Sequence, residues 1–295
     1  MRKAEKIKAW IQASRPPFFV ATLIPLTVGA VMAGKQGSFH LWPFIFVLLG
    51  SFLVHFATNI ANDYFDHLQG TDAGDSIGGS RVLQDGKITA SELLAAIILL
   101  YLLASAIGLG LAWLLDLWAI VPLMVLAAFS SLFYVAPPVR YGYHGLGEVF
   151  VGINMGPVMV LGSYWVLLGH TDFAALPVSL PIGLMVALIL YYQSLPDIET
   201  DERMGKRTLA VRMGKTRALA GLWVFCCTIY ASIVLLIVYG RFTAVAWWTL
   251  LSFPLLVCLW HKIHLAGSQQ DLDRFGGYIR AFYFINGLIL IAALL

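Results

Sequence analysis

The sequence predicts an all-α protein that crosses a membrane many times, and three observations carry this prediction. Hydrophobic residues make up 60% of the 295 residues. Only 12% are charged, which is about half the share of an ordinary soluble domain. The apolar residues fall in long runs, and helices are the usual way for such runs to satisfy their backbone within a bilayer. The net charge of +3 is too small to indicate a nucleic-acid partner.

Nine apolar runs are interpreted as membrane helices. Their ranges are about 18–34, 41–66, 91–114, 118–135, 146–169, 173–198, 217–239, 243–262 and 276–294. Residues 1–14 are basic and amphipathic, so we expect this segment to lie on the membrane surface. We interpret residues 1–295 as a single domain embedded in the lipid bilayer.

The basic residues predict the orientation of these helices. If the N-terminus lies inside, the inner segments hold every lysine and arginine except Lys35 and Arg241. An excess of basic residues marks the cytoplasmic side. We therefore expect a multi-pass protein of the inner (cytoplasmic) membrane. Its N-terminus and the loops after its even-numbered helices should be cytoplasmic.

Polar side chains follow one face of the second predicted helix. His55, Asn59, Asn62, Asp63 and Asp66 are spaced i, i+4, i+7, i+8 and i+11. Acidic residues at the end of an apolar helix are costly unless they face a polar cavity or a cation. They could form an ordinary polar helix end, but carboxylates at a helix C-terminus oppose the macrodipole. Carboxylate and amide oxygens are the ligands that Mg²⁺ prefers. His55 is equally compatible with a packed, hydrogen-bonded residue.

A second polar stripe closes the sixth predicted helix. Gln193, Asp197 and Asp201 are spaced i, i+4 and i+8, and Pro196 should kink or break the helix before the acids. Both stripes end an even-numbered helix and precede a loop rich in glycine and basic residues. This match predicts a parallel repeat of four helices, with the ninth helix added, and one divalent-metal site between the stripes. The expected metal ligands are Asn62, Asp63, Asp66, Asp72, Asp197 and Asp201.

Basic loop residues accompany both acidic stripes. Arg81, Arg203 and Lys206 are candidates to bind a diphosphate bridged by the metal, because Arg and Lys pair with phosphate oxygens. Arg81 and Lys206 follow closely on glycines, where the backbone can approach a phosphate. The same residues could be solvated loop charges that only set the topology. Tyr134 and Tyr141 could be interfacial belt residues, or their ring faces could flank a cation.

The two motifs resemble those of a known family. The runs NDYFDHLQGTD and PDIETDERMGKRTLAVRMG are similar to the acidic motifs of the UbiA superfamily of intramembrane prenyltransferases. The run FYVAPPVRYGYHGLGEVFVGINMGPVMVLGSYWV resembles the branch that prenylates 1,4-dihydroxy-2-naphthoate in menaquinone synthesis.

The resemblance implies a nine-helix bundle around a central cavity that opens sideways to lipid. Asn62, Asp66, Asp197 and Asp201 would be the catalytic residues, holding Mg²⁺ on a polyprenyl diphosphate. Arg140 would join the diphosphate-binding residues. The cavity for the substrates would be lined by Arg15, His55, Asn59, Tyr134, Tyr141 and Gln193.

The sequence departs from the family pattern at three places. Position 70 is Gly where a third acid is common, and Asp72 is the next acid. Gln193 to Pro196 replaces an Asn-Asn-x-Arg run, and Arg15-Pro16-Pro17 replaces Arg-Pro-Lys. These changes leave the expected metal chemistry intact but leave several acceptors open: naphthoate, hydroxybenzoate, homogentisate, a haem or chlorophyll precursor, or a glycerol phosphate. A cation-coupled transporter is the alternative from another class, although its acids would lie nearer the middle of the membrane.

Overall fold

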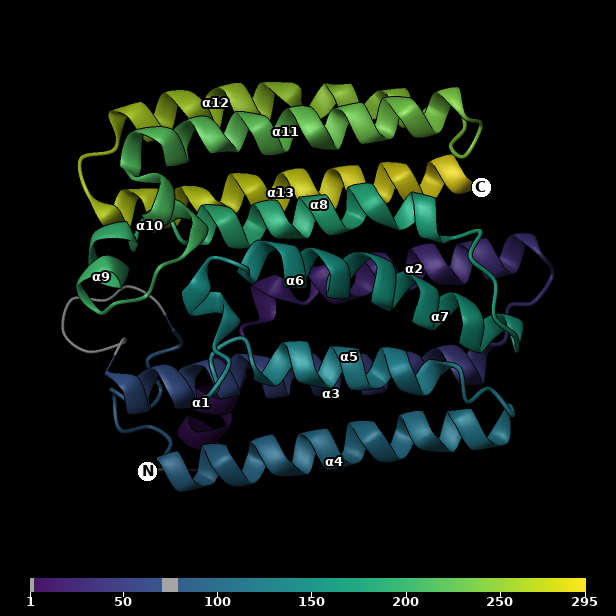
Figure 1. The fold of residues 1–295 in the computed structure, drawn as a ribbon, viewed down its shortest axis with the longest axis horizontal. Helices are drawn as coiled ribbons and strands as arrows, with labels where there is room; N and C mark the ends of the chain where they lie inside the picture. Colours follow the sequence, from purple (N-terminus) through teal and green to yellow (C-terminus); the bar gives the residue numbers. More distant parts are fainter. Residues whose placement is uncertain (1–2, 71–78) are drawn as a thin grey trace.

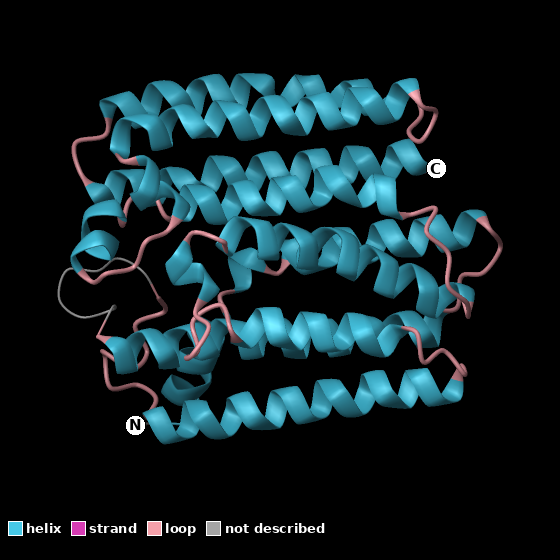
Figure 2. Ribbon diagram, viewed as in Figure 1, coloured by secondary structure: helices cyan, strands magenta, loops and turns pink. Residues whose placement is uncertain are grey.

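The computed structural model describes residues 3–70 and 79–295, and within these ranges the chain forms helices and no strands (Figure 2). The long helices lie side by side with their axes nearly parallel (Figure 1). In chain order, the elements are α1 (Lys3–Ser14), η1 (Pro16–Phe18), α2 (Val20–Lys35), α3 (Leu41–Gln69), α4 (Ala90–Leu114), α5 (Ile120–Leu132), η2 (Tyr141–His144), α6 (Gly147–Ile153), η3 (Asn154–Val158), α7 (Met159–Leu168), α8 (Leu176–Gln193), α9 (Ile198–Arg203), α10 (Leu209–Met213), α11 (Lys215–Val238), η4 (Ala244–Ser252), α12 (Phe253–Leu265) and α13 (Gln269–Leu294).

The described helices include seven that are long and apolar enough to cross a membrane, with α6 to α7 and η4 to α12 each taken as one span. The first predicted helix corresponds mainly to α2. Its axis is bent by 55° from the preceding segment, which consists of α1 and η1. The fourth, α5, is a shorter apolar helix. The all-helical membrane fold is thus confirmed, and the count of nine is approximate. The internal four-helix repeat stays a prediction.

Apolar side chains lie on the outer surface of the bundle as well as in its core. Trp42 on α3 and Leu102 and Trp113 on α4 are strongly exposed. Water would not tolerate so much apolar surface, whereas lipid does. The most buried span is α8, which packs against α6, α11 and α13 at the centre of the bundle. The protein is therefore a multi-pass membrane protein.

The short helices α1, α9 and α10 lie toward the end of the bundle that carries the acidic motifs (Figure 1). The α1 helix is held there by Lys6, whose Nζ lies 2.6 Å from Oε2 of Glu92 on α4. Glu92 also forms a capping box with Thr89, which fixes the start of α4. Ala9 and Ala13 of α1 are buried in a core shared with α3 and α4. Whether this segment also contacts the membrane surface stays a prediction.

Two helices differ from their predicted bounds. The sixth predicted helix, 173–198, ends at Gln193 in α8, and a separate short helix, α9, begins at Ile198. Pro196 lies in the break, as the missing N–H and the ring of proline require. The last helix begins at Gln269, well before the predicted residue 276, and Ser268 caps it by accepting from the Asp271 N–H.

The fifth span contains an irregular turn. Residues Asn154–Val158 form a π-helical segment between α6 and α7. It packs tightly on α8, because a Cβ on Gly156 would lie only 2.7 Å from Cα of Gly183. Such wide turns re-aim side chains and are common at functional sites.

Candidate active site

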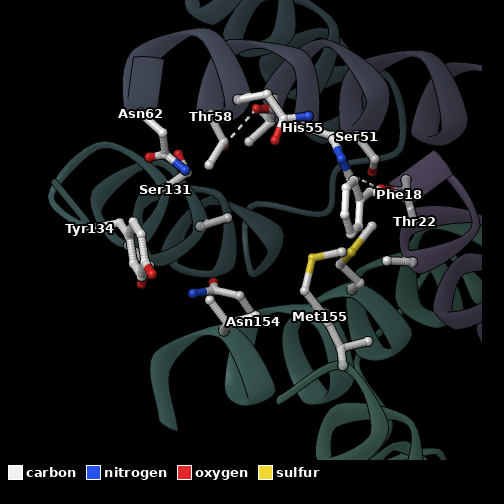
Figure 3. Close-up of a pocket in the computed structure, with 18 of the residues that line it drawn as sticks. Phe18, Thr22, Ser51, His55, Thr58, Asn62, Ser131, Tyr134, Asn154 and Met155 are labelled. Atoms are coloured by element: carbon white, nitrogen blue, oxygen red, sulfur yellow. Dashed lines mark hydrogen bonds between the residues drawn. The ribbon is translucent and has the colours of Figure 1, made fainter. Parts of the chain in front are cut away.

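A cavity of about 900 Å³ runs through the bundle and receives the acidic motifs at one end. Its polar end is formed by Asn62 and Asp66 of α3, Asp197 and Asp201 at α9, and Lys206. The deeper walls are mostly apolar and include Leu26, Ile107, Leu123, Met155, Val158 and Val186. In the close-up, Asn62 and Tyr134 lie on one side of the cavity, and Phe18, Thr22 and Met155 lie on the other (Figure 3).

Lys206 lies between carboxylates from the two motifs. Its Nζ is 3.8 Å from Oδ2 of Asp66 and 3.7 Å from Oδ1 of Asp201. The chain can place it there because Gly205 adopts a left-handed backbone (φ +73°) just after α9. The Lys206 N–H then donates to the Asp201 carbonyl over 2.8 Å. The two motifs, distant in sequence, therefore meet at a single cation.

Tyr143 completes the surroundings of this cation. Its hydroxyl donates to Oδ1 of Asp66 over 2.7 Å, and the Lys206 Nζ lies 5.3 Å from the centre of its ring. Tyr143 comes from η2, which is held against the Lys206 loop by a hydrogen bond from the Arg207 N–H to the Tyr143 carbonyl. Three separate segments thus fix the geometry of this end of the cavity.

The electrostatics of the site favour a further cation. Burial raises the pKa of the Asp201 carboxyl to about 6, Lys206 opposes the rise, and the carboxylates of Asp197 and Asp66 add to it. Burial would lower the pKa of Lys206, but Asp66 and Asp201 outweigh it and raise the pKa above its usual value. Two acids therefore share one ammonium group, and the charge of Asp197 acts on Asp201 as well. A divalent ion would relieve the repulsion that remains.

Asn62 offers a second indication of a cation. Its Oδ1 atom is buried and accepts no hydrogen bond from the residues that the structure describes, although buried polar atoms normally have a partner. Because Asn62 lines the cavity beside the acidic cluster, an amide oxygen and three carboxylates form a donor set that fits Mg²⁺. Among the described residues, no three His, Cys, Asp or Glu side chains lie close enough together to hold a metal ion as they stand.

Asp63 differs from the other expected ligands, because it does not line the cavity. One of its oxygens accepts from Nη2 of Arg15 and, over 3.1 Å, from the Ser80 N–H. The other accepts from the Ser80 hydroxyl. Its carboxylate is thus already occupied by the protein. We assign Asp63 a positioning role and remove it from the proposed ligand set. Asp72 lies outside the described residues.

The residues expected in the substrate cavity all line it. His55 forms a hydrogen bond of 2.6 Å with the hydroxyl of Thr22 on α2, so it is both packed and open to the cavity. The Asn59 Nδ2 donates to the Ser14 carbonyl over 2.9 Å and ties α3 to the end of α1. Gln193 faces the cavity from the last residue of α8.

Arg15 and the two tyrosines complete this group. Arg15 lines the cavity beside the ion pair with Asp63. The Tyr141 hydroxyl donates to the Ser130 carbonyl, and its ring packs edge-on against Tyr134 at 5.5 Å. Burial raises the pKa of the Tyr134 hydroxyl above its usual value, so this group stays neutral.

The expected diphosphate ligands divide into two groups. Lys206 lines the cavity, whereas Arg81, Arg140 and Arg203 do not. Arg140 donates to Oε1 of Gln69 over 2.8 Å, and Arg203 donates to the Glu199 carbonyl over 3.2 Å. Arg81 and Arg203 are exposed. The cationic contact expected from sequence therefore falls to Lys206, with Arg15 nearby.

Sequence reasoning missed Ser80, which holds Asp63, and Asn154, whose side chain faces the cavity from the π-helical segment (Figure 3). The Asn154 Oδ1 is buried and accepts no hydrogen bond from the described residues, while its Nδ2 donates to the Phe150 carbonyl. The Gly156-Pro157 pair inside an apolar run was the available signal, because proline disturbs the helical ladder.

Comparisons with known proteins agree with this geometry. The sequence profile of the UbiA prenyltransferase family matches residues 22–287. The chain belongs to the UbiA prenyltransferase family. It is 32% identical to the 1,4-dihydroxy-2-naphthoate octaprenyltransferase of Haemophilus influenzae over 91% of this chain and 89% of the relative. It is also 32% identical to the enzyme of that name from Escherichia coli K12, over 87% and 85% of the two chains.

A solved structure has the same fold. The UbiA homologue from Archaeoglobus fulgidus bound to GPP and Mg²⁺ superposes with a TM-score of 0.66 over 96% of this chain and 99% of that chain. The two sequences are 16% identical. This likeness shows the fold, and membership of the UbiA family makes the protein a membrane prenyltransferase.

Proposed function

We propose that this UbiA protein transfers a polyprenyl group from a polyprenyl diphosphate to 1,4-dihydroxy-2-naphthoate, in a reaction that requires Mg²⁺ and belongs to menaquinone synthesis. One observation carries the proposal: acids from α3 and α9 meet at one end of a long, mostly apolar cavity. Two relatives that match most of the chain bear the name 1,4-dihydroxy-2-naphthoate octaprenyltransferase. A structural relative was solved with GPP and Mg²⁺.

The polar end of the cavity would hold the diphosphate. Asn62, Asp66, Asp197 and Asp201 provide the oxygen ligands for Mg²⁺, which when bound neutralises the diphosphate as a leaving group. Lys206 lies where its ammonium group can move from the carboxylates to a phosphate oxygen. Arg15 also lines the cavity and adds positive charge there. This arrangement stabilises the charge that develops on the leaving oxygen.

The apolar length of the cavity would hold the polyprenyl chain and exclude water. The allylic C–O bond breaks, and its electron pair leaves with the diphosphate. The ring carbon that bears the carboxylate uses an electron pair of the electron-rich ring to form the new C–C bond. The carboxylate departs as CO₂, and the electron pair of its bond returns to the ring. The aromatic rings of Tyr134 and Tyr141 near the polar end can stabilise the allylic cation through their faces.

We also propose that the acidic end faces the cytoplasm, with the protein in the inner membrane. The distribution of lysine and arginine supports this orientation. In a variant without native cysteines, Ser91→Cys should react only with reagents that reach the cytoplasm, and Thr171→Cys only with reagents outside. Both positions are exposed. Reversed labelling would overturn the orientation.

The function is tested with purified protein, a labelled polyprenyl diphosphate and a panel of aromatic acceptors. We expect a prenylated naphthoquinol and one CO₂ for each product molecule, with activity lost on adding a chelator and restored by Mg²⁺. Turnover of only another acceptor, such as hydroxybenzoate, would refute the naphthoate assignment. Full turnover in excess chelator would refute the metal requirement.

A further inference from the structure

The α13 helix carries an arginine into the cavity. Arg280 lies well inside α13 (Gln269–Leu294), is half-buried, and lines the same cavity as the acidic motifs. A charged residue inside a membrane helix is costly, and where it is kept it usually faces a polar pathway or a ligand. The position of Arg280 therefore indicates that its side chain has a partner in the cavity.

Arg280 makes no ion pair and no hydrogen bond with the residues that the structure describes. Its guanidinium carbon lies 5.3 Å from the centre of the Phe18 ring. Asp273 lies two turns earlier on the same helix and also lines the cavity, but it is not within ion-pair distance of Arg280. A guanidinium group has five N–H donors in a planar fork, so its hydrogen-bonding capacity is unused.

The other basic residues of the cavity are already engaged. Arg15 pairs with Asp63, and Lys206 lies between Asp66 and Asp201. Among the described lining residues, Arg280 is the basic side chain with no carboxylate beside it. It is also on a different helix from the acidic motifs, which are on α3 and α9. Arg280 therefore brings a cation into the cavity from a helix that carries neither acidic motif.

We propose that Arg280 binds the carboxylate of the aromatic acceptor, while the Phe18 ring fixes the plane of the guanidinium group. This inference rests on the proposed function, because it assumes an acceptor that carries a carboxylate. A planar guanidinium fork matches a carboxylate with two parallel hydrogen bonds. The contact with the Phe18 ring uses none of the N–H groups as a hydrogen-bond donor to oxygen, so they stay available for those bonds. Arg280 would thus be a specificity residue for the acceptor, with no direct role in breaking the C–O bond.

The test compares two ligands that differ only in the carboxylate. Equilibrium binding of 1-hydroxy-2-naphthoate and of 1-naphthol is measured by quenching of tryptophan fluorescence, without prenyl diphosphate. The wild-type protein should prefer the carboxylate ligand, and Arg280→Gln should remove that preference. Hydrogen bonds to charged groups contribute about 1.5–3 kcal/mol, so we expect the carboxylate ligand to bind about 10- to 100-fold more weakly to the variant. Binding of 1-naphthol should be unchanged.

Steady-state kinetics provide the second readout. Arg280→Gln should raise the KM for 1,4-dihydroxy-2-naphthoate by a similar factor and leave the KM for the polyprenyl diphosphate within about twofold. Arg280→Lys should recover part of the loss, because it restores the charge without the fork. Arg274→Gln is the matched control: it removes an exposed arginine from the same helix, away from the cavity, and should change neither KM. The melting temperature should hold in Arg280→Gln, since no ion pair or hydrogen bond with a described residue is lost.

Three outcomes would overturn the proposal: an unchanged preference for the carboxylate ligand in Arg280→Gln, a change confined to the KM for the polyprenyl diphosphate, or an effect that appears only in nanodiscs with anionic lipid. The last would mean that Arg280 binds a lipid phosphate. If the wild-type protein prenylates no naphthoate, the proposed function fails. If it does prenylate but Arg280→Gln keeps the carboxylate preference, only this inference fails.

Discussion

Asp63 and Asp66 are one helical turn apart at the end of the same helix, and both are almost fully buried, yet they have different surroundings. Asp63 is surrounded by the protein's own donors, from Arg15 and from the backbone and hydroxyl of Ser80. Asp66 faces the cavity and contacts Tyr143 and Lys206. The first carboxylate is fixed in an internal ion pair. The second contacts the Lys206 ammonium group at 3.8 Å, and we propose that a ligand replaces this contact.

This difference shows how one acidic motif can carry two tasks. The pair of Asp63 and Arg15 joins α3 to the bend between α1 and α2 and therefore shapes the cavity. We propose that Asp66 takes part in the chemistry, because it shares Lys206 with Asp201 from the second motif. Removing the Asp63 carboxylate should thus lower stability, whereas removing the Asp66 carboxylate should lower turnover and leave stability unchanged or higher.

The largest effect is expected at the cavity. Asp66→Asn keeps the volume of the side chain and removes a metal ligand, so the rate of prenyl transfer should fall by about 10²-fold or more, or roughly 3 kcal/mol of barrier. The melting temperature in detergent without Mg²⁺ should hold or rise, because the acids repel one another in the metal-free protein. Prenyl transfer at nearly the wild-type rate would remove Asp66 from the active site.

A smaller effect, on stability, is expected at Asp63. Asp63→Asn leaves Arg15 without its carboxylate, and breaking such a buried pair costs about 3 kcal/mol. The melting temperature should fall in the presence and in the absence of Mg²⁺, while the protein that stays folded should keep most of its Mg²⁺ affinity. Ser80→Ala is the matched control, since it removes one hydrogen bond and no charge. An Asp63→Asn variant with normal stability and lost metal binding would return Asp63 to the ligand set.

The smallest effect concerns pH. Burial raises the pKa of Asp201 from 3.8 to about 6 in the folded protein. The folded state therefore binds the proton more tightly than the unfolded state, and the contribution to stability is lost as the pH rises from about 4 to 6. In the presence of a chelator, the melting temperature should fall by a few degrees across that range. Asp201→Asn should make this profile flat, and an unchanged slope in the variant would assign the effect to another group.

The sequence predicts much of the first stripe through simple helical geometry. At about 100° per residue, Asn62 and Asp66 lie within about 20° of His55 around the helix, whereas Asp63 lies about 80° away. The cavity-lining positions of His55, Asn62 and Asp66 thus follow from spacing. The same calculation places Asp63 at the edge of the stripe, where it meets Ser80 instead. Counting Asp63 among the ligands rests on residue type rather than on angle, and the Asp63→Asn variant tests it.

Other features depend on contacts that spacing does not contain. Lys206 reaches both acids only because α8 ends before Pro196, α9 turns back, and Gly205 reverses the chain. The resemblance implied Arg140 as a further diphosphate-binding residue, but its side chain contacts Gln69 and the ring of Tyr143 and does not line the cavity. The π-helical segment at Asn154 depends on close packing against Gly183, which only the folded bundle reveals.

The central claim is that the two acidic motifs act on one diphosphate as a unit, and a double-mutant cycle tests it most directly. The rates of prenyl transfer are measured at saturating Mg²⁺ for the wild-type protein, Asp66→Asn, Asp201→Asn and the double variant. Residues that act as a unit are strongly non-additive. The double variant should therefore be little slower than either single variant. Independent losses that multiply to about 10⁴-fold in the double variant would contradict a shared site.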